Sequence, residues 1–153
     1  GELFARAAAL DPGYAAAHAN LGLLEIAGHM RGEGGGDLAA GIAQAREAIR
    51  LAPDLPLAYQ VLSFGLAESG DYRAGLQAAE RAVELNPSEP DSLLALAKAQ
   101  LRFGSYEDAV ANAAMARRLH PMAPDYYPYI HGQALYAAGR PAAARERLRW
   151  LVT

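Results

Sequence analysis

The chain contains no cysteine, which excludes a disulfide framework, a thiolate nucleophile and a cysteine-ligated zinc or iron–sulfur site. It also lacks an excess of basic charge, because 14 basic and 17 acidic side chains leave a net charge of −3. Neutralising many phosphates needs a concentrated basic surface, so nucleic acid is not an expected partner. The sequence has no apolar run of about 18 residues, so it predicts neither a membrane span nor a membrane partner.

Aromatic residues are few, at 12 of 153, whereas alanine occurs 36 times and 52% of the residues are hydrophobic. Alanine is the best helix former and a poor strand former. This composition predicts an ordered, all-α chain without a sheet. The absence of cysteine fits a reducing compartment, and we expect a cytoplasmic protein. The first residues already follow a helical pattern without an initiating methionine, so we expect a piece of a longer protein.

The sequence repeats with a 34-residue period. A Leu-x-Pro motif ends at Pro12, Pro53, Pro87 and Pro121, so that the first interval is longer than the two that follow, which are equal. Two sets of alanines keep the 34-residue spacing: Ala45, Ala79 and Ala113, and Ala48, Ala82 and Ala116. Within each unit, the apolar spacing predicts two helices. The expected helices span residues 2–10, 14–30, 38–50, 55–69, 72–84, 89–103, 106–118, 124–138 and 141–152.

Helix starts are predicted from residues whose side chains can accept a hydrogen bond from the free amides of the first turn. Asp37, Asp71 and Ser105 lie in 34-residue register and are the expected N-caps. Ser88 to Asp91 and Ser105 to Asp108 resemble capping boxes with aspartate in the last position.

The first helix of each unit carries the motifs His18-x2-Leu21-Gly22-x2-Glu25, Tyr59-x2-Leu62-Ser63-x2-Leu66 and Leu93-x2-Leu96-Ala97-x2-Gln100. With the period and the closing prolines, they resemble the tetratricopeptide repeat (TPR) family. The resemblance implies an all-α, right-handed α-solenoid of helix-turn-helix repeats. Small residues at Gly22, Ser63 and Ala97 are expected to let neighbouring helices approach closely. We predict a single domain over 1–153, comprising a trailing half-repeat 2–12, a repeat with a loop insertion 13–53, repeats 54–87 and 88–121, and a terminal repeat 122–153.

Two departures from the plain repeat narrow the resemblance. The segment from Gly28 to Gly36 replaces a tight turn, and the segment from Pro121 to Gly139 is one residue longer than its counterpart. Both are similar to features of TPR arrays attached to bacterial adenylate or guanylate cyclases and related regulators. This resemblance implies a regulatory part of a larger bacterial protein.

The sequence gives little indication of a catalytic site. The glycines from Gly32 to Gly36 lack the Lys-Ser/Thr ending of a phosphate loop, and the four histidines do not form a helical ligand pair. No nucleophile, base and orienting acid can be assembled. We therefore expect no catalytic residues, no metal and no cofactor, and a protein that is not an enzyme. A cofactor-binding or enzymatic domain remains a competing hypothesis.

The resemblance implies that the first helix of each repeat lines a concave, partner-binding surface. The predicted groove residues are Asn20, Leu23, Gln60, Phe64, Glu68, Lys98, Arg102, Tyr129, Gln133 and Tyr136. Phe64, Tyr129 and Tyr136 offer apolar platforms, and Lys98 and Arg102 lie one helical turn apart. The expected partner is a protein or peptide segment with apolar and acidic groups.

The C-terminal end offers an alternative interface. It holds five of the 12 aromatic residues, Tyr126, Tyr127, Tyr129, Tyr136 and Trp150, and it carries a charge of +4 from residue 117 onward. A homo-oligomer formed through this end therefore stays open as a competing hypothesis.

TPR domains that bind the acidic tails of heat-shock chaperones use a lysine, two asparagines, a further lysine and an arginine. The corresponding residues here are Ala19, Leu23, Val61, Asp91 and Ala95, and every one departs from that pattern. The sequence therefore predicts that this carboxylate clamp is absent.

Overall fold

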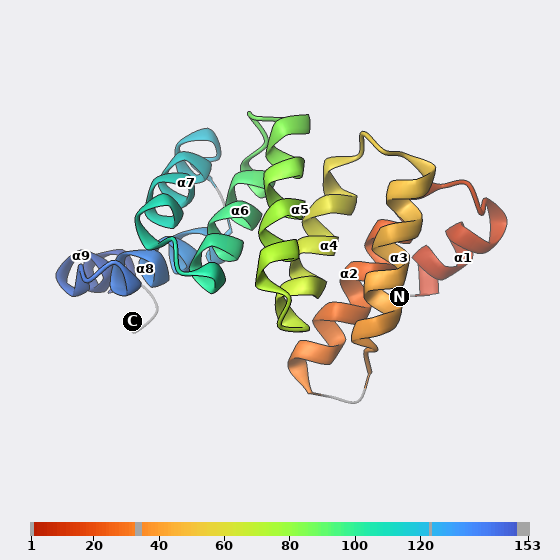
Figure 1. Cartoon of the computed structure of the whole chain (residues 1–153), viewed down its shortest axis with the longest axis horizontal. Helices are drawn as coiled ribbons and strands as arrows, with labels where there is room; N and C mark the ends of the chain where they lie inside the picture. The colour runs from red at the N-terminus through yellow and green to blue at the C-terminus, as the bar shows by residue number, and fades with distance from the viewer. Residues whose placement is uncertain (1, 33–34, 123, 150–153) are drawn as a thin grey trace.

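The computed structural model describes residues 2–32, 35–122 and 124–149, which form a row of paired helices without a strand (Figure 1). The helices are α1 (Glu2–Leu10), α2 (Ala15–Arg31), α3 (Leu38–Leu51), α4 (Pro56–Glu68), α5 (Tyr72–Leu85), α6 (Pro90–Phe103), α7 (Tyr106–Leu119), α8 (Tyr126–Ala137) and α9 (Pro141–Arg147). The all-α prediction is confirmed. Most helix ends lie within two residues of the predicted ones. The last helix ends at Arg147, whereas it was expected to reach 152, and residues 150–152 lie outside the described residues.

Two of the predicted N-caps are confirmed. Asp37 Oδ1 accepts hydrogen bonds from the Ala39 and Ala40 amides at 2.8 and 3.1 Å, and Asp71 Oδ1 accepts from the Ala74 amide at 3.1 Å.

The serine caps were predicted wrongly. Ser105 occupies the N-cap position of α7, but its side chain makes no capping hydrogen bond. Ser88 lies outside α6, because Pro90 takes the first helical position, where a missing N–H costs nothing, and this makes Glu89 the N-cap residue. The Glu89 carboxylate bonds to the side chains of Gln60 and Ser92 instead of capping α6.

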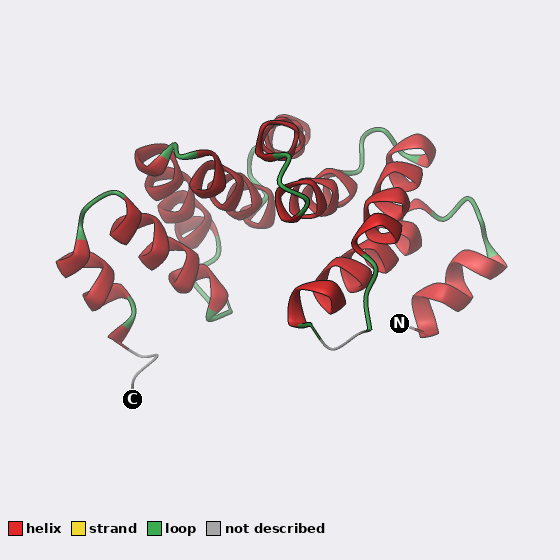
Figure 2. Cartoon of the chain, turned by 60° about the horizontal axis from the view of Figure 1, so that its bottom comes forward, coloured by secondary structure: helices red, strands yellow, loops and turns green. Residues whose placement is uncertain are grey.

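The array is curved, and the first helix of each pair lies on its inner side. Along the chain, α2 contacts α4, α4 contacts α6 and α6 contacts α8. Among the described residues, α3, α5 and α7 make no corresponding contacts with one another. Helices that touch their neighbours on one side and spread on the other form an arch, which Figure 2 shows. The expectation that first helices line the concave side therefore agrees with the packing.

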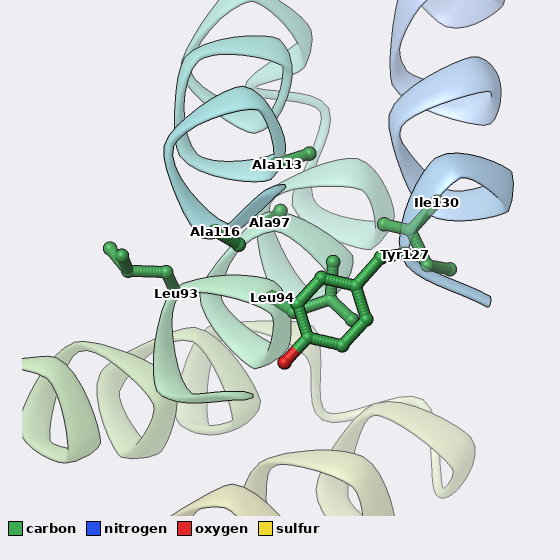
Figure 3. Packing of buried hydrophobic residues seen from close by; sticks show 7 residues of the cluster. All are labelled: Leu93, Leu94, Ala97, Ala113, Ala116, Tyr127 and Ile130. Carbon is green, nitrogen blue, oxygen red and sulfur yellow. The ribbon is translucent and has the colours of Figure 1, made fainter. Parts of the chain in front are cut away.

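The two alanine registers form the seam between helices. All six of these alanines have 0% exposed surface: Ala45, Ala48, Ala79, Ala82, Ala113 and Ala116. Larger side chains fill the space that the alanines leave, as in the cluster where α6, α7 and α8 meet (Figure 3). There Tyr127 and Ile130 belong to one buried cluster with Leu93 and Leu94. Burial of small residues in register thus positions α4, α6 and α8 side by side.

Gly22 allows α2 and α3 to pack at backbone distance. A Cβ atom on Gly22 would lie 2.7 Å from the Gly41 carbonyl oxygen and 3.2 Å from Val61 Cγ1. Alanine has the better helix propensity by about 1 kcal/mol, but overpacking costs about 1–3 kcal/mol. The difference between these two terms leads us to expect that Gly22→Ala lowers the free energy of unfolding by up to about 2 kcal/mol in urea denaturation. A stabilised variant would show that α2 and α3 can separate without cost.

Candidate functional site

Three adjoining hollows lie along the inner face of the array, and Lys98 lines all of them. The central hollow, of about 310 Å³, is lined by Leu23, Leu57, Gln60, Val61, Phe64, Asp91, Leu94, Ala95, Lys98 and Tyr126. The C-terminal hollow, of about 460 Å³, is lined by Lys98, Leu101, Arg102, Ile130, Gly132, Gln133, Tyr136, Ala137, Ala144 and Leu148. A smaller hollow of about 50 Å³ is lined by Met30, Ser63, Phe64, Ala67, Glu68, Lys98, Ala99 and Arg102. We call the three together the inner groove.

Lys98 is a half-buried cation in the middle of this groove. Its Nζ atom lies 4.2 Å from the centroid of the Phe64 ring, a cation–π distance at which the ring stabilises the charge. Burial lowers the pKa of Lys98, Glu68 opposes that change, and Arg102 adds to it. In the described part of the chain, no carboxylate forms an ion pair with the Lys98 ammonium. Its three N–H donors are therefore available to a bound group.

Arg102, which lies one turn further along α6, is already paired. Its Nη2 atom lies 3.1 Å from Glu68 Oε1 of α4. The pair is partly exposed, so it contributes only about 0–1 kcal/mol to stability. Arg102 is therefore a weaker anchor for an incoming carboxylate than Lys98 is, which the sequence did not indicate.

Asp91 places a negative charge at the other end of the central hollow. Its Oδ1 atom accepts hydrogen bonds from the Tyr126 hydroxyl at 2.9 Å and the Tyr127 hydroxyl at 2.6 Å. Burial, reinforced by the bond to Asp91, raises the pKa of Tyr126 to about 12. The same causes raise the pKa of Tyr127. Both tyrosines therefore stay neutral donors at physiological pH and hold the Asp91 carboxylate at the groove edge.

A buried polar cluster closes the floor near Asp91. Gln60 Nε2 donates to Glu89 Oε2 at 2.8 Å and to Ser92 Oγ at 2.9 Å, and Ser92 Oγ donates to the same carboxylate. Gln60 is only 5% exposed. Its side chain thus joins α4 to α6, which makes it a structural member of the groove.

Eight of the ten predicted groove residues line at least one of the three hollows: Leu23, Gln60, Phe64, Glu68, Lys98, Arg102, Gln133 and Tyr136. Asn20 and Tyr129 line none of them. The Asn20 amide donates to the Ala16 carbonyl of its own helix, and the Tyr129 hydroxyl accepts from Gln133.

Sequence reasoning missed several lining residues, of which Leu57, Asp91, Leu101, Ile130 and Leu148 matter most for the chemistry of the groove. The 34-residue period held a usable signal, because residues in the same register lie side by side in adjacent repeats. Leu57 and Asp91 are one full period apart in the sequence, as are Phe64 and Lys98.

The described residues do not meet the requirements of a metal site, a membrane span or a chaperone-tail clamp. No group of three His, Asp or Glu side chains there could hold a metal ion, and no described helix is long and apolar enough to cross a bilayer. At the positions of the chaperone-tail clamp, Ala19, Val61 and Ala95 are buried. Because alanine and valine side chains are apolar, these three positions offer no charge for a carboxylate.

Stacked helix pairs around a lined inner groove define an α-solenoid repeat protein. The family model described as tetratricopeptide repeat matches residues 65–124. This stretch is therefore TPR sequence, and the described residues have the TPR solenoid fold. No curated protein matches the chain.

Several solved structures share the fold. PilW, a widely conserved type IV pilus biogenesis factor, is 19% identical with a TM-score of 0.71, over 98% of this chain and 66% of PilW. MamA from Desulfovibrio magneticus RS-1 is 16% identical with a TM-score of 0.67, over 95% and 77% of the two chains. YrrB, described as a TPR protein with an unusual peptide-binding site, is 18% identical with a TM-score of 0.64, over 95% and 71%. At these identities the likeness concerns the fold.

Proposed function

We propose that the chain is a non-catalytic protein-interaction module that binds a peptide or partner-protein segment in its inner groove. The observation that carries the proposal is Lys98, a half-buried cation that lines all three hollows and has no carboxylate partner among the described residues. Burying a charge costs free energy unless it is paired, and a bound carboxylate would supply the pair. The resemblance of the sequence segments Gly28 to Gly36 and Pro121 to Gly139 to those of cyclase-attached TPR arrays supports a cytoplasmic, regulatory role in a larger bacterial protein.

The C-terminal hollow supplies the apolar part of the proposed site. Leu101, Ile130 and Leu148 line it beside Tyr136, which is 71% exposed. An aromatic or large aliphatic side chain of the partner would be desolvated there, and such buried anchors carry most of the energy of an interface. Phe64 contributes less platform than expected, because Lys98 covers one face of its ring.

Replacing groove aromatics should weaken binding more than removing the cation. A desolvated aromatic anchor is worth about 2 kcal/mol, or roughly 30-fold in Kd, whereas a partly exposed ion pair is worth about 0–1 kcal/mol. After a partner has been identified by affinity capture, Tyr136→Ala should raise Kd by roughly 10- to 30-fold, and Phe64→Ala, whose ring Lys98 covers on one face, by roughly tenfold. Lys98→Ala should raise it by roughly fivefold or less at physiological salt. Isothermal titration calorimetry with purified partner measures all three.

Tyr72→Ala is the matched control, because Tyr72 is an exposed aromatic at the start of α5, outside the three hollows. It should bind as the parent does. Unchanged affinity in all groove variants, combined with loss of binding in Arg145→Glu on α9, would move the interface to the C-terminal end.

Self-assembly is the second candidate, favoured by apolar side chains exposed near both ends of the array. Leu3 and Leu10 of α1 are 82% and 80% exposed, and Met122 before α8 is 90% exposed. End-to-end association would cover such surfaces. Sedimentation velocity over a wide range of protein concentrations distinguishes the two candidates, because only self-assembly gives a sedimentation coefficient that rises with concentration and falls back in Met122→Lys.

A further inference from the structure

The inner groove carries opposite charges at two defined positions. We infer that it binds an amphipathic helix bearing one basic and one acidic side chain seven residues apart, with the basic group at Asp91 and the acidic group at Lys98. This inference rests on the proposed function and specifies its partner. It also changes the expected partner, because Asp91 was absent from the predicted groove and disfavours a segment that is acidic throughout.

The spacing of the two charges is set by α6. Asp91 and Lys98 are seven residues apart, so they lie about two turns, or roughly 10.5 Å, apart along one face of the helix. Both line the central hollow. Leu94 and Ala95 lie between them, also line this hollow, and form an apolar floor. The groove therefore has the order acidic, apolar and basic along one helix.

Neither charge forms an ion pair within the described part of the protein. Asp91 accepts two hydrogen bonds on Oδ1, both from neutral tyrosines, and no described basic side chain forms an ion pair with it. Lys98 contacts the Phe64 ring and no carboxylate. A ligand with complementary charges gains a favourable electrostatic interaction at both ends, whereas an acidic group placed at Asp91 is repelled by a like charge.

A helical ligand matches this spacing better than an extended one. In a helix, residues i and i+7 lie on one face about 10.5 Å apart, with i+3 and i+4 between them. An extended chain covers the same distance in about three residue steps, from i to i+3, and the side chains of residues i and i+3 point to opposite faces. The apolar residues at i+3 and i+4 of a helix would lie over Leu94 and Ala95.

Two lactam-bridged helical peptides of about four turns each, on an alanine and glutamine background, test the inference. The bipolar peptide carries Lys at position 4, Leu at 7 and 8, and Glu at 11, and the acidic peptide carries Glu at both 4 and 11. Fluorescence polarisation with the full chain should give a Kd about tenfold lower for the bipolar peptide. In Asp91→Asn, which keeps an acceptor for both tyrosines, the two Kd values should agree within about twofold.

Glu80→Gln is the control, since it removes one negative charge from an exposed position on α5 outside the three hollows. It should keep the tenfold preference. Lys98→Met, which removes the charge and keeps an unbranched side chain that is one heavy atom shorter, should weaken both peptides. Equal affinities of the two peptides for the parent protein, or a preference for the bipolar peptide that persists in Asp91→Asn, would overturn the inference. If Phe64→Ala then abolished binding of the peptides, the inner groove would still be their binding site. Binding of neither peptide would also overturn it, whereas the proposed function depends separately on the captured partner.

Discussion

Replacing Tyr127 with alanine is expected to lower the free energy of unfolding by about 3–5 kcal/mol, the usual cost of deleting a buried aromatic side chain. Tyr127 is 1% exposed and is the largest fully buried side chain among the described residues. Its ring packs edge-on against His120 and Tyr126, with centroids 5.7 and 4.9 Å away. Its hydroxyl also bonds to Asp91. Alanine would remove all these contacts from the cluster that joins α6, α7 and α8.

Two further variants separate the contributions to this effect in urea denaturation. Tyr127→Phe keeps the ring and loses only the hydroxyl bond, so it should cost about 1 kcal/mol. Tyr126→Ala removes the neighbouring tyrosine, which is 47% exposed, and should cost clearly less than Tyr127→Ala. Because repeats are stabilised by their immediate neighbours, hydrogen exchange should increase most in α6, α7 and α8. A loss below about 1 kcal/mol in Tyr127→Ala would contradict the packing.

The fold was predictable because the 34-residue period and the small residues both point to the same interface between neighbouring helices. A 34-residue repeat places equivalent alanines at one interface after another, and only small side chains allow that spacing. The helix starts were less predictable. Asp37 and Asp71 cap as expected, but the Glu89 carboxylate is drawn into a tertiary cluster with Gln60 and Ser92, and local sequence does not contain that partner.

The sequence was a better guide to which helices carry the candidate site than to the contacts among its side chains. Helical spacing put Lys98 and Arg102 one turn apart on one helix face, and the family resemblance implied that the first helices, which carry these residues and Phe64, line the inner side. It did not reveal that Phe64 stacks on Lys98 or that Glu68 pairs with Arg102, although the members of each pair are one full period apart. Asp91 was considered as the last residue of a capping box and as a departure from another binding pattern, and not as a groove residue. Its role at the groove edge depends on Tyr126 and Tyr127, which lie more than one period further along the chain, at the start of α8.

Acidification should destabilise the C-terminal part of the array through His131. This side chain of α8 is 7% exposed, and its Nδ1 atom lies 3.4 Å from Arg117 Nη1 of α7. Because an arginine can only donate, Nδ1 is the acceptor in this contact and must carry no proton. Burial, followed by the charges of Arg147 on α9 and Arg117, lowers the pKa of His131 from 6.5 to about 4. Protonation would place a third cation beside two guanidinium groups.

The pH dependence follows from this lowered pKa. Between pH 6.5 and 4 the unfolded chain binds a proton at His131 that the folded chain does not, so stability is complete above about pH 6.5 and falls as the pH approaches 4. Each pKa unit is worth about 1.4 kcal/mol, which makes the loss up to about 3 kcal/mol. Urea denaturation at pH 7.5, 6, 5 and 4 should therefore show a steeper decline for the parent than for His131→Gln, even if the variant is less stable at pH 7.5. His29→Gln, at an exposed position on α2, should keep the parent slope. Parallel slopes for the parent and His131→Gln would mean that His131 is protonated in the folded protein as readily as in the unfolded chain, and that water or movement of α9 relieves the positive cluster.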